Sequence, residues 1–247
     1  MSVLNIVALA FFASCWLFYQ PLLTALSRTA GTAINTDMTT IRTAWMRNMV
    51  GRENRFMDGQ LLGHALNSAS FFASSNLILI AACASALFSG EAAFRSASAL
   101  VVIKTSTRLL FEGQLALVLI CLARGLLDFI WSIRQMNYCI AAIGAVPLSI
   151  AKDDPRYGAY GVAVAKMLNP ALSSFNAGVR GYYFALAAGA WLFGPLSFMA
   201  ATAGAVTLLL WRQRSSRTAF AVRDLRALLE AEKPYEKPAE PSGTSAA

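Results

Sequence analysis

Three ionisable side chains lie within one long apolar stretch of this chain. Glu112, Arg124 and Asp128 all occur between residues 109 and 133, and Arg124 and Asp128 are four positions apart, so they are neighbours on one helix face. A charge near the centre of a bilayer costs about 2.5–3.5 kcal/mol on insertion scales. Two interpretations are open: the three residues line a polar cavity or ion path, or Arg124 and Asp128 form an ion pair at the head-group level of a helix that projects beyond the membrane.

A second set of polar residues lies outside the apolar stretches. Its members, from residues 52–58 and 134–137, are Arg52, Glu53, Arg55, Asp58, Arg134 and Asn137. In a four-span topology the two segments lie on the same side of the membrane. Because arginine binds phosphate and carboxylate groups bidentately, we expect this cluster to bind an anionic head group or a partner. The alternative is an interfacial salt-bridge network that fixes the geometry of the loop.

The chain offers little for metal binding or catalysis. It has one histidine, His64, and four cysteines that are dispersed in apolar surroundings, Cys15, Cys83, Cys121 and Cys139. A zinc site needs about four clustered ligands, and a nucleophile needs an adjacent base. We therefore expect no catalytic residue, no metal site and no cofactor. A membrane-embedded enzyme is the least favoured class of protein.

The composition identifies the medium in which the chain folds. Hydrophobic residues make up 57% and charged residues 14% of its 247 residues, whereas a soluble domain has about 25% charged residues. Four apolar stretches, 3–26, 66–89, 109–133 and 182–211, are each near or above the roughly 20 residues that cross a bilayer. The sequence predicts an all-α integral membrane protein with about four transmembrane helices, interfacial amphipathic helices and a long third helix.

We divide the chain into one helical membrane domain, residues 1–212, and a shorter C-terminal part. Residues 34–58 place apolar side chains every three or four positions, with arginines largely off that stripe, which is typical of a helix lying in the interface. Gly51 predicts a break or bend in this helix, which leaves residues 52–58 as a separate polar turn. Residues 213–232 suit an amphipathic tail helix, and the Pro- and Glu-rich residues 233–247 suit a disordered tail. Gly194-Pro195 predicts a kink within the fourth span.

Small residues at spacing four predict close contacts between helices. Such ladders let helix backbones approach each other, and an amide at membrane depth bonds to a neighbouring helix. The ladders and the amide are Ala69 with Ala73, Ser70 with Ser74, Gly181 with Ala185 and Gly189, and Asn76.

The net charge of +8 favours a membrane surface with anionic lipid head groups over nucleic acid as the partner. The distribution of positive charge does not orient the protein, since the two sides of a four-span topology carry equal numbers of Lys and Arg. Leaving out the distant Lys233 and Lys237 tilts the balance weakly towards a cytoplasmic first loop.

Four segments together resemble one known family. They are Arg-Glu-Asn-Arg-Phe-Met-Asp at 52–58, Leu-Leu-Gly-His at 61–64, Ser-Ala-Ser-Phe-Phe-Ala-Ser-Ser at 68–75, and Trp-Ser-Ile-Arg-Gln-Met-Asn-Tyr-Cys at 131–139. Their order and spacing are similar to those of the bacterial branch of an uncharacterised membrane family, domain of unknown function 599, which also has plant members. The resemblance covers residues 1–215 or so. It implies a multi-span helical protein, here of a bacterial inner (cytoplasmic) membrane, and it implies no activity and no site residue.

We expect a non-catalytic scaffold, accessory or assembly protein with a basic interfacial surface. Its partners would be membrane lipids with anionic head groups and a second copy or another membrane protein. The alternative is a small oligomeric transporter or channel that uses Glu112, Arg124 and Asp128.

Overall fold

The computed structural model describes residues 2–29, 33–104, 107–148, 150–151 and 153–231, and every regular element among them is helical. The elements are α1 (Val3–Thr29), α2 (Ile34–Val50), α3 (Phe56–Phe88), α4 (Glu91–Ser98), α5 (Arg108–Ala145), α6 (Tyr157–Gly189), the 3-10 turn η1 (Ala190–Phe193), α7 (Pro195–Arg214) and α8 (Arg217–Ala231). The predicted all-α class is confirmed. The predicted disordered tail, 233–247, lies outside the described residues.

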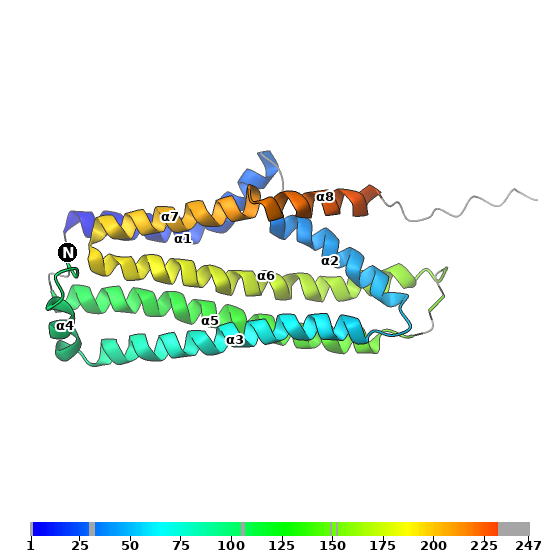
Figure 1. The fold of residues 1–247 in the computed structure, drawn as a ribbon, viewed down its shortest axis with the longest axis horizontal. Coiled ribbons are helices and arrows are strands. Elements are labelled where there is room, and N and C mark those ends of the chain that lie inside the picture. The colour runs from blue at the N-terminus through cyan, green and yellow to red at the C-terminus, as the bar shows by residue number, and fades with distance from the viewer. Residues whose placement is uncertain (1, 30–32, 105–106, 149, 152, 232–247) are drawn as a thin grey trace, which may run out of the picture.

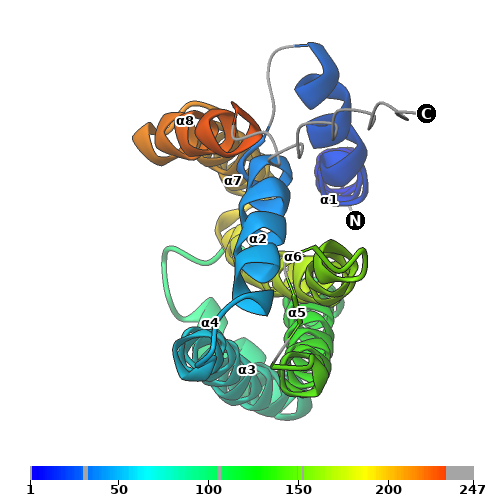
Figure 2. The ribbon, with the colours of Figure 1, turned by 90° about the vertical axis from the view of Figure 1, so that its right-hand side faces the viewer.

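The helices form an elongated bundle with two distinct halves (Figure 1). Helices α3, α5 and α6 run along its whole length, α1 and α7 lie along one half, and α2 and α8 cover the other. The end view places α6 in the middle, with α5 and α3 on one side and α1 and α7 on the other (Figure 2). Of all the helix pairs, α5 and α6 make the most extensive contact.

The long helices exceed the thickness of a bilayer. Helix α5 has 38 residues and α3 and α6 have 33 each, which gives lengths of about 57 and 50 Å at 1.5 Å per residue. The hydrocarbon core is only about 30 Å thick. We assign the bilayer to the end with α1 and α7, and call it the membrane half. The end with α2 and α8 is the projecting half.

Among the described residues, four helices are long and apolar enough to cross a membrane, within Val3–Ala25, Phe56–Phe88, Arg108–Ala145 and Pro195–Ala231. The predicted span 182–211 is not one helix. Helix α6 ends at Gly189, and Gly194 has φ +110°, a backbone conformation that glycine adopts without a steric penalty. Pro195 then starts α7 in the opposite direction, as proline at the first helical position favours. The predicted kink is therefore a complete reversal (Figure 1).

Small residues bring α5 and α6 together in the membrane half. A Cβ atom on Gly181 would lie 3.1 Å from Gly125 Cα, and one on Gly125 would lie 3.3 Å from the Gly178 carbonyl oxygen. The side-chain amide of Asn76 donates to the Leu122 carbonyl of α5 over 2.9 Å. The predicted close approach at Gly181 and the predicted interhelical bond of Asn76 are confirmed.

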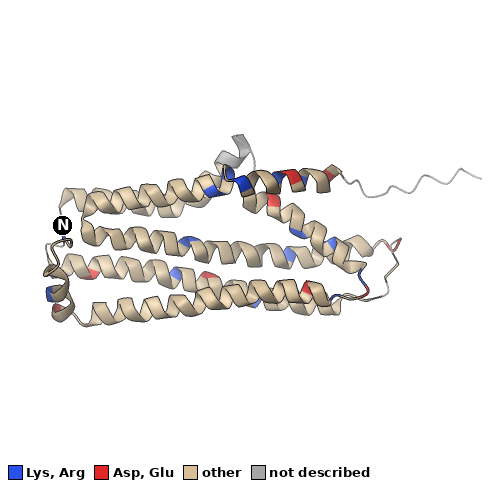
Figure 3. Ribbon diagram, viewed as in Figure 1, with Lys and Arg blue, Asp and Glu red and all other residues tan. Residues whose placement is uncertain are grey.

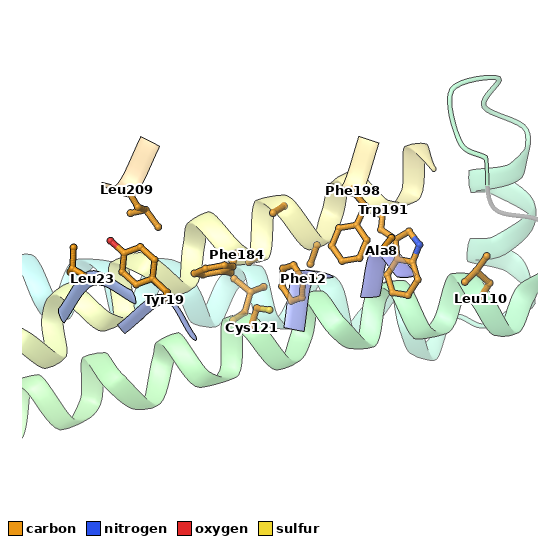
Figure 4. Close-up of a cluster of buried hydrophobic side chains, with 14 of the residues drawn as sticks. Ala8, Phe12, Tyr19, Leu23, Leu110, Cys121, Phe184, Trp191, Phe198 and Leu209 are labelled. Atoms are coloured by element: carbon orange, nitrogen blue, oxygen red, sulfur yellow. The ribbon is translucent and has the colours of Figure 1, made fainter. Parts of the chain in front are cut away.

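Each half of the bundle has its own apolar core. The membrane half packs Phe12, Phe184, Phe198 and Trp191 against one another (Figure 4). The core of the projecting half consists largely of methionine and aliphatic side chains, among them Met46, Met49, Leu62, Met136, Val164 and Leu168.

The predicted break at Gly51 is present, because α2 stops at Val50 and a turn precedes α3. The burial of α2 differs from the prediction. Arg42 was expected on the polar side but is only 8% exposed, and Asp37 is fully buried. The reason is that α2 packs against both α6 and α8, so its charged side is covered by protein. The predicted tail helix 213–232 corresponds to α8, which begins at Arg217.

Candidate functional site

The structure does not bring together the three predicted intramembrane residues. Glu112 accepts a hydrogen bond of 2.7 Å from Arg108 Nε near the start of α5. Arg124 is twelve positions further on, about 18 Å along the helix axis. A guanidinium nitrogen of Arg124 lies 3.2 Å from Asp128 Oδ1. Glu112 therefore belongs to the opposite end of the membrane half, and only Arg124 and Asp128 form a pair.

A groove of about 530 Å³ opens beside this pair, between α1, α5 and α6. Its walls are Trp16, Leu17, Tyr19, Gln20, Ile120, Arg124, Asp128, Ala177, Arg180, Gly181 and Phe184. The walls are therefore mostly apolar, with two arginines, one aspartate and one glutamine among them. We call this the α1/α5/α6 groove.

Arg180 is the residue of this groove that sequence reasoning missed. Its guanidinium carbon lies 5.6 Å from the ring centroid of Tyr19, a residue that is 3% exposed, and this arrangement is a cation–π contact. Arg180 has no ion-pair partner within 4 Å in the part of the chain that the structure describes. The predicted fourth span begins at residue 182 and so leaves Arg180 outside it. The small residues Gly178 and Gly181 on either side could have marked it as part of a packed helix.

The groove lies one bilayer thickness from the far end of the bundle. Asp128 is twenty positions after Arg108 on α5, about 30 Å along the axis, which matches the hydrocarbon core. On α7, the guanidinium of Arg212 donates to the Tyr183 hydroxyl of α6, next to Trp211. Tyrosine, tryptophan and arginine gather at membrane–water interfaces. If the start of α5 marks one surface of the hydrocarbon, the groove lies at head-group depth on the other side.

The second predicted cluster is divided into separate contacts. The fully buried carboxylate of Asp58, at the start of α3, accepts a hydrogen bond of 2.6 Å from Trp45 Nε1. Arg52, in the turn between α2 and α3, forms an ion pair with the same carboxylate oxygen. These contacts fasten the start of α3 to α2.

Arg55 binds backbone carbonyls at two helix ends. It donates to the carbonyl oxygens of Val50 over 3.2 Å and of Pro147 over 2.8 Å, and also to that of Val146. The last carbonyls of a helix have no partner within the helix, and a nearby cation also suits the negative end of the helix dipole. Arg55 therefore holds the ends of α2 and α5 together.

The other three members of the cluster, Glu53, Arg134 and Asn137, have exposed side chains. Arg134 donates to the Tyr138 hydroxyl on its own helix over 3.3 Å. The Ile143 carbonyl near the end of α5 also accepts from Arg55, over 3.4 Å. Arg134 is nine positions before Ile143, and so about 13 Å away along the helix axis. The expected six-residue site is not assembled, and the contacts present fit a network that fixes loop geometry.

Helices α2 and α8 share a buried charge cluster that the sequence did not indicate. The Asp37 carboxylate is 2.8 Å from Arg226 and 3.9 Å from Arg223. Arg42, five positions after Asp37 on α2, is also buried, and burial lowers its pKa. The residues are far apart in sequence, and only the packing of α8 on α2 brings them together.

Among the described residues, no group of three or more His, Cys, Asp or Glu side chains is placed to hold a metal ion. The family model described as "Protein of unknown function, DUF599" matches residues 7–218 of the chain. No curated protein and no solved structure matches the chain.

Proposed function

The chain belongs to the DUF599 family of uncharacterised proteins, and we propose that it is a non-catalytic membrane scaffold that holds partners at one membrane surface. The observation that carries this proposal is the concentration of basic residues at the projecting half (Figure 3). At that end, either beyond the membrane half or at its boundary, lie Arg42, Arg47, Arg52, Arg55, Arg134, Arg156, Lys166, Arg212, Arg214, Arg217, Arg223 and Arg226. At the opposite end are Arg95, Lys104 and Arg108.

This asymmetry supports one orientation of the protein. Because α6 and α7 form an antiparallel pair, the C-terminal part of α6 must accompany α7 through the bilayer, and the chain crosses five times. The N- and C-terminal ends of the described chain are then on opposite sides. Basic residues favour the cytoplasmic side, so the projecting half is cytoplasmic. The four-span topology gave equal numbers of Lys and Arg on the two sides only because it counted residues from opposite ends of the bundle on the same side.

Exposed apolar side chains on the projecting half support a protein partner. At the start of α3, Phe56 is 69% and Met57 is 63% exposed, and Leu61 is 49% exposed. The last twenty residues of α3 are enough to cross the hydrocarbon. These three residues come at least eight positions before them, and so lie about 12 Å beyond the hydrocarbon. Lipid does not cover them there, and clustered exposed apolar groups mark interaction sites. The partner is another membrane protein or a second copy of the chain.

A crosslinking experiment in native membranes tests this proposal. A photoreactive residue at Met57 should yield a discrete crosslinked product. A matched probe at Val101, which is 97% exposed at the opposite end, should yield none or a different one. A chain that purifies as a partnerless monomer from mild detergent, with no product at Met57, would contradict a scaffold role.

A transport role through Glu112, Arg124 and Asp128 has less support. Glu112 is about 18 Å from Arg124 along α5, and Gly194-Pro195 forms a turn between two helices rather than a break within one. Transport would be favoured instead if Asp128→Asn abolished the cellular role of the protein while its folding and crosslinked product were unchanged.

A further inference from the structure

We propose that the α1/α5/α6 groove is a binding site for the phosphate-bearing head group of an anionic phospholipid, with Arg180 as the main ligand. The lining of the groove includes three charged side chains, Arg124, Asp128 and Arg180, and the apolar side chains of Leu17 and Ile120. Charged groups beside apolar ones match the two ends of a lipid molecule.

The charge balance of the groove calls for an anion. Arg124 is 3.2 Å from Asp128, so one positive charge is balanced within the chain. Arg180 contributes a second positive charge: it lies over the Tyr19 ring and shares the electrostatic influence of Asp128, so two arginines face one carboxylate and one positive charge remains. A guanidinium has five N–H donors, and an aromatic face offers none of them a conventional oxygen acceptor. Two phosphate oxygens would fit this fork.

The position of the groove selects a lipid over a soluble anion. Asp128 and Arg180 are at head-group depth, about 30 Å from the start of α5. Leu17 is 70% and Ile120 is 55% exposed. Ile120 is eight positions before Asp128 on α5, about 12 Å closer to the bilayer centre, where exposed side chains contact acyl chains rather than water. A phospholipid can therefore place its phosphate against Arg180 while one of its chains covers these two side chains.

The leaflet follows from the proposed orientation, and this step alone rests on the proposed function. The groove is at the boundary between the membrane half and the projecting half, so it faces the cytoplasmic leaflet, where anionic lipids create a negative surface potential. If the orientation were reversed, the lipid would come from the other leaflet and the groove would still bind it.

Native mass spectrometry of the full chain tests the site, and it requires no partner protein. The purified protein is titrated with phosphatidylglycerol in mild detergent, with phosphatidylcholine and inorganic phosphate as separate arms. We expect one phosphatidylglycerol per chain at low concentration and weaker binding of phosphatidylcholine. Arg180→Gln should weaken the first phosphatidylglycerol about tenfold or more, because it loses charge-assisted hydrogen bonds.

Two further variants keep the result interpretable. Arg134→Gln removes an exposed arginine from α5 in the projecting half and should leave the first binding event unchanged. Ile120→Trp fills the groove from its exposed rim without removing charge and should weaken binding as Arg180→Gln does, so it carries the test if Arg180→Gln does not fold. Equal lipid binding by wild type, Arg180→Gln and Ile120→Trp would overturn the proposal. Displacement of the lipid by millimolar phosphate would show an anion site without lipid specificity and would overturn it too.

Discussion

The two halves of this bundle stabilise their buried polar groups in different ways. In the membrane half, uncharged side chains bond to uncharged partners on other helices: Asn76 to the Leu122 carbonyl, Gln114 to the Trp191 carbonyl and Trp191 to Asn5, over 2.8 to 3.0 Å. In the projecting half the buried groups Asp37 and Asp58 are ionic.

The difference follows from the solvent around each half. A neutral polar group costs far less than a charge in hydrocarbon, so the membrane half uses amides and an indole N–H. Outside the bilayer, water hydrates both partners of an ion pair while the chain is unfolded. In the folded chain, protein on several sides must then hold the two buried side chains in place. The energetic consequence is testable, because breaking a buried ion pair leaves an uncompensated charge, whereas losing one interhelical amide bond does not.

The largest expected effect is at Asp37, in the projecting half. Asp37→Ala removes the fully buried carboxylate that Arg226 contacts at 2.8 Å. Breaking a buried pair costs about 3–5 kcal/mol, and we expect about 3 here, since both arginines at Asp37 are more than a quarter exposed. Unfolding in a dodecyl sulfate titration measures the cost, and hydrogen exchange should show that α8 loses protection.

The matched control for Asp37 is Glu230→Gln, which removes the other carboxylate beside Arg226. That pair is also 2.8 Å long, but the Glu230 side chain is 50% exposed. We expect a cost of about 0.5 kcal/mol or less. Full protection of α8 in the Asp37→Ala protein would mean that the ion pair does not hold α8 on α2.

A smaller effect is expected at Gly161, where α6 meets α2. A Cβ atom there would lie 2.6 Å from Arg47 Cα and 2.8 Å from the Met46 carbonyl oxygen, and backbone atoms cannot move aside as a flexible side chain can. Gly161→Ala should therefore separate α2 from α6 at a net cost of about 1–3 kcal/mol. A cysteine crosslink placed across the contact should form more slowly in the variant.

Gly63→Ala on α3 is the control for Gly161→Ala, because nothing lies within 4 Å of its added Cβ. Alanine is favoured over glycine inside a helix by about 1 kcal/mol, so this variant should be slightly more stable than wild type. If both variants were stabilised, the contact between α2 and α6 would be looser than the distance of 2.6 Å at Gly161 indicates.

The sequence could predict the elements that depend on composition and period. Apolar length identified α1, α3 and α5 as spans, and helical spacing identified α2 and α8. It could not separate α6 from α7, because apolar residues lie on both sides of Gly194 and a reversal has the same composition as a kink. The one residue pair that could have signalled the turn, Gly194-Pro195, is compatible with both.

The candidate site was predictable only where its residues are close in sequence. Arg124 and Asp128 are one helical turn apart, so their pairing follows from the helix period. Arg180 and Tyr19 join them from two other helices, and their positions depend on the α6–α7 reversal that the sequence left hidden. For the same reason the charge count could not orient the protein until the two ends of the bundle were known.

The smallest expected effect is at Asn76, and it decides the comparison between the two halves. Asn76→Ala removes the bond of 2.9 Å to the Leu122 carbonyl, but it also removes the buried side-chain oxygen of Asn76, which has no hydrogen-bond partner among the described residues. Interhelical hydrogen bonds in membranes are worth about 0.6 kcal/mol on average and 1.7 at most. The variant should therefore lose about that much free energy of unfolding in the same titration.

The control is Ser74→Ala, at an exposed position on the same helix, which should lose no measurable stability. A loss at Asn76 as large as that of Asp37→Ala would mean that the membrane half depends on its polar bonds as strongly as the projecting half does, and the contrast between the two halves would fail.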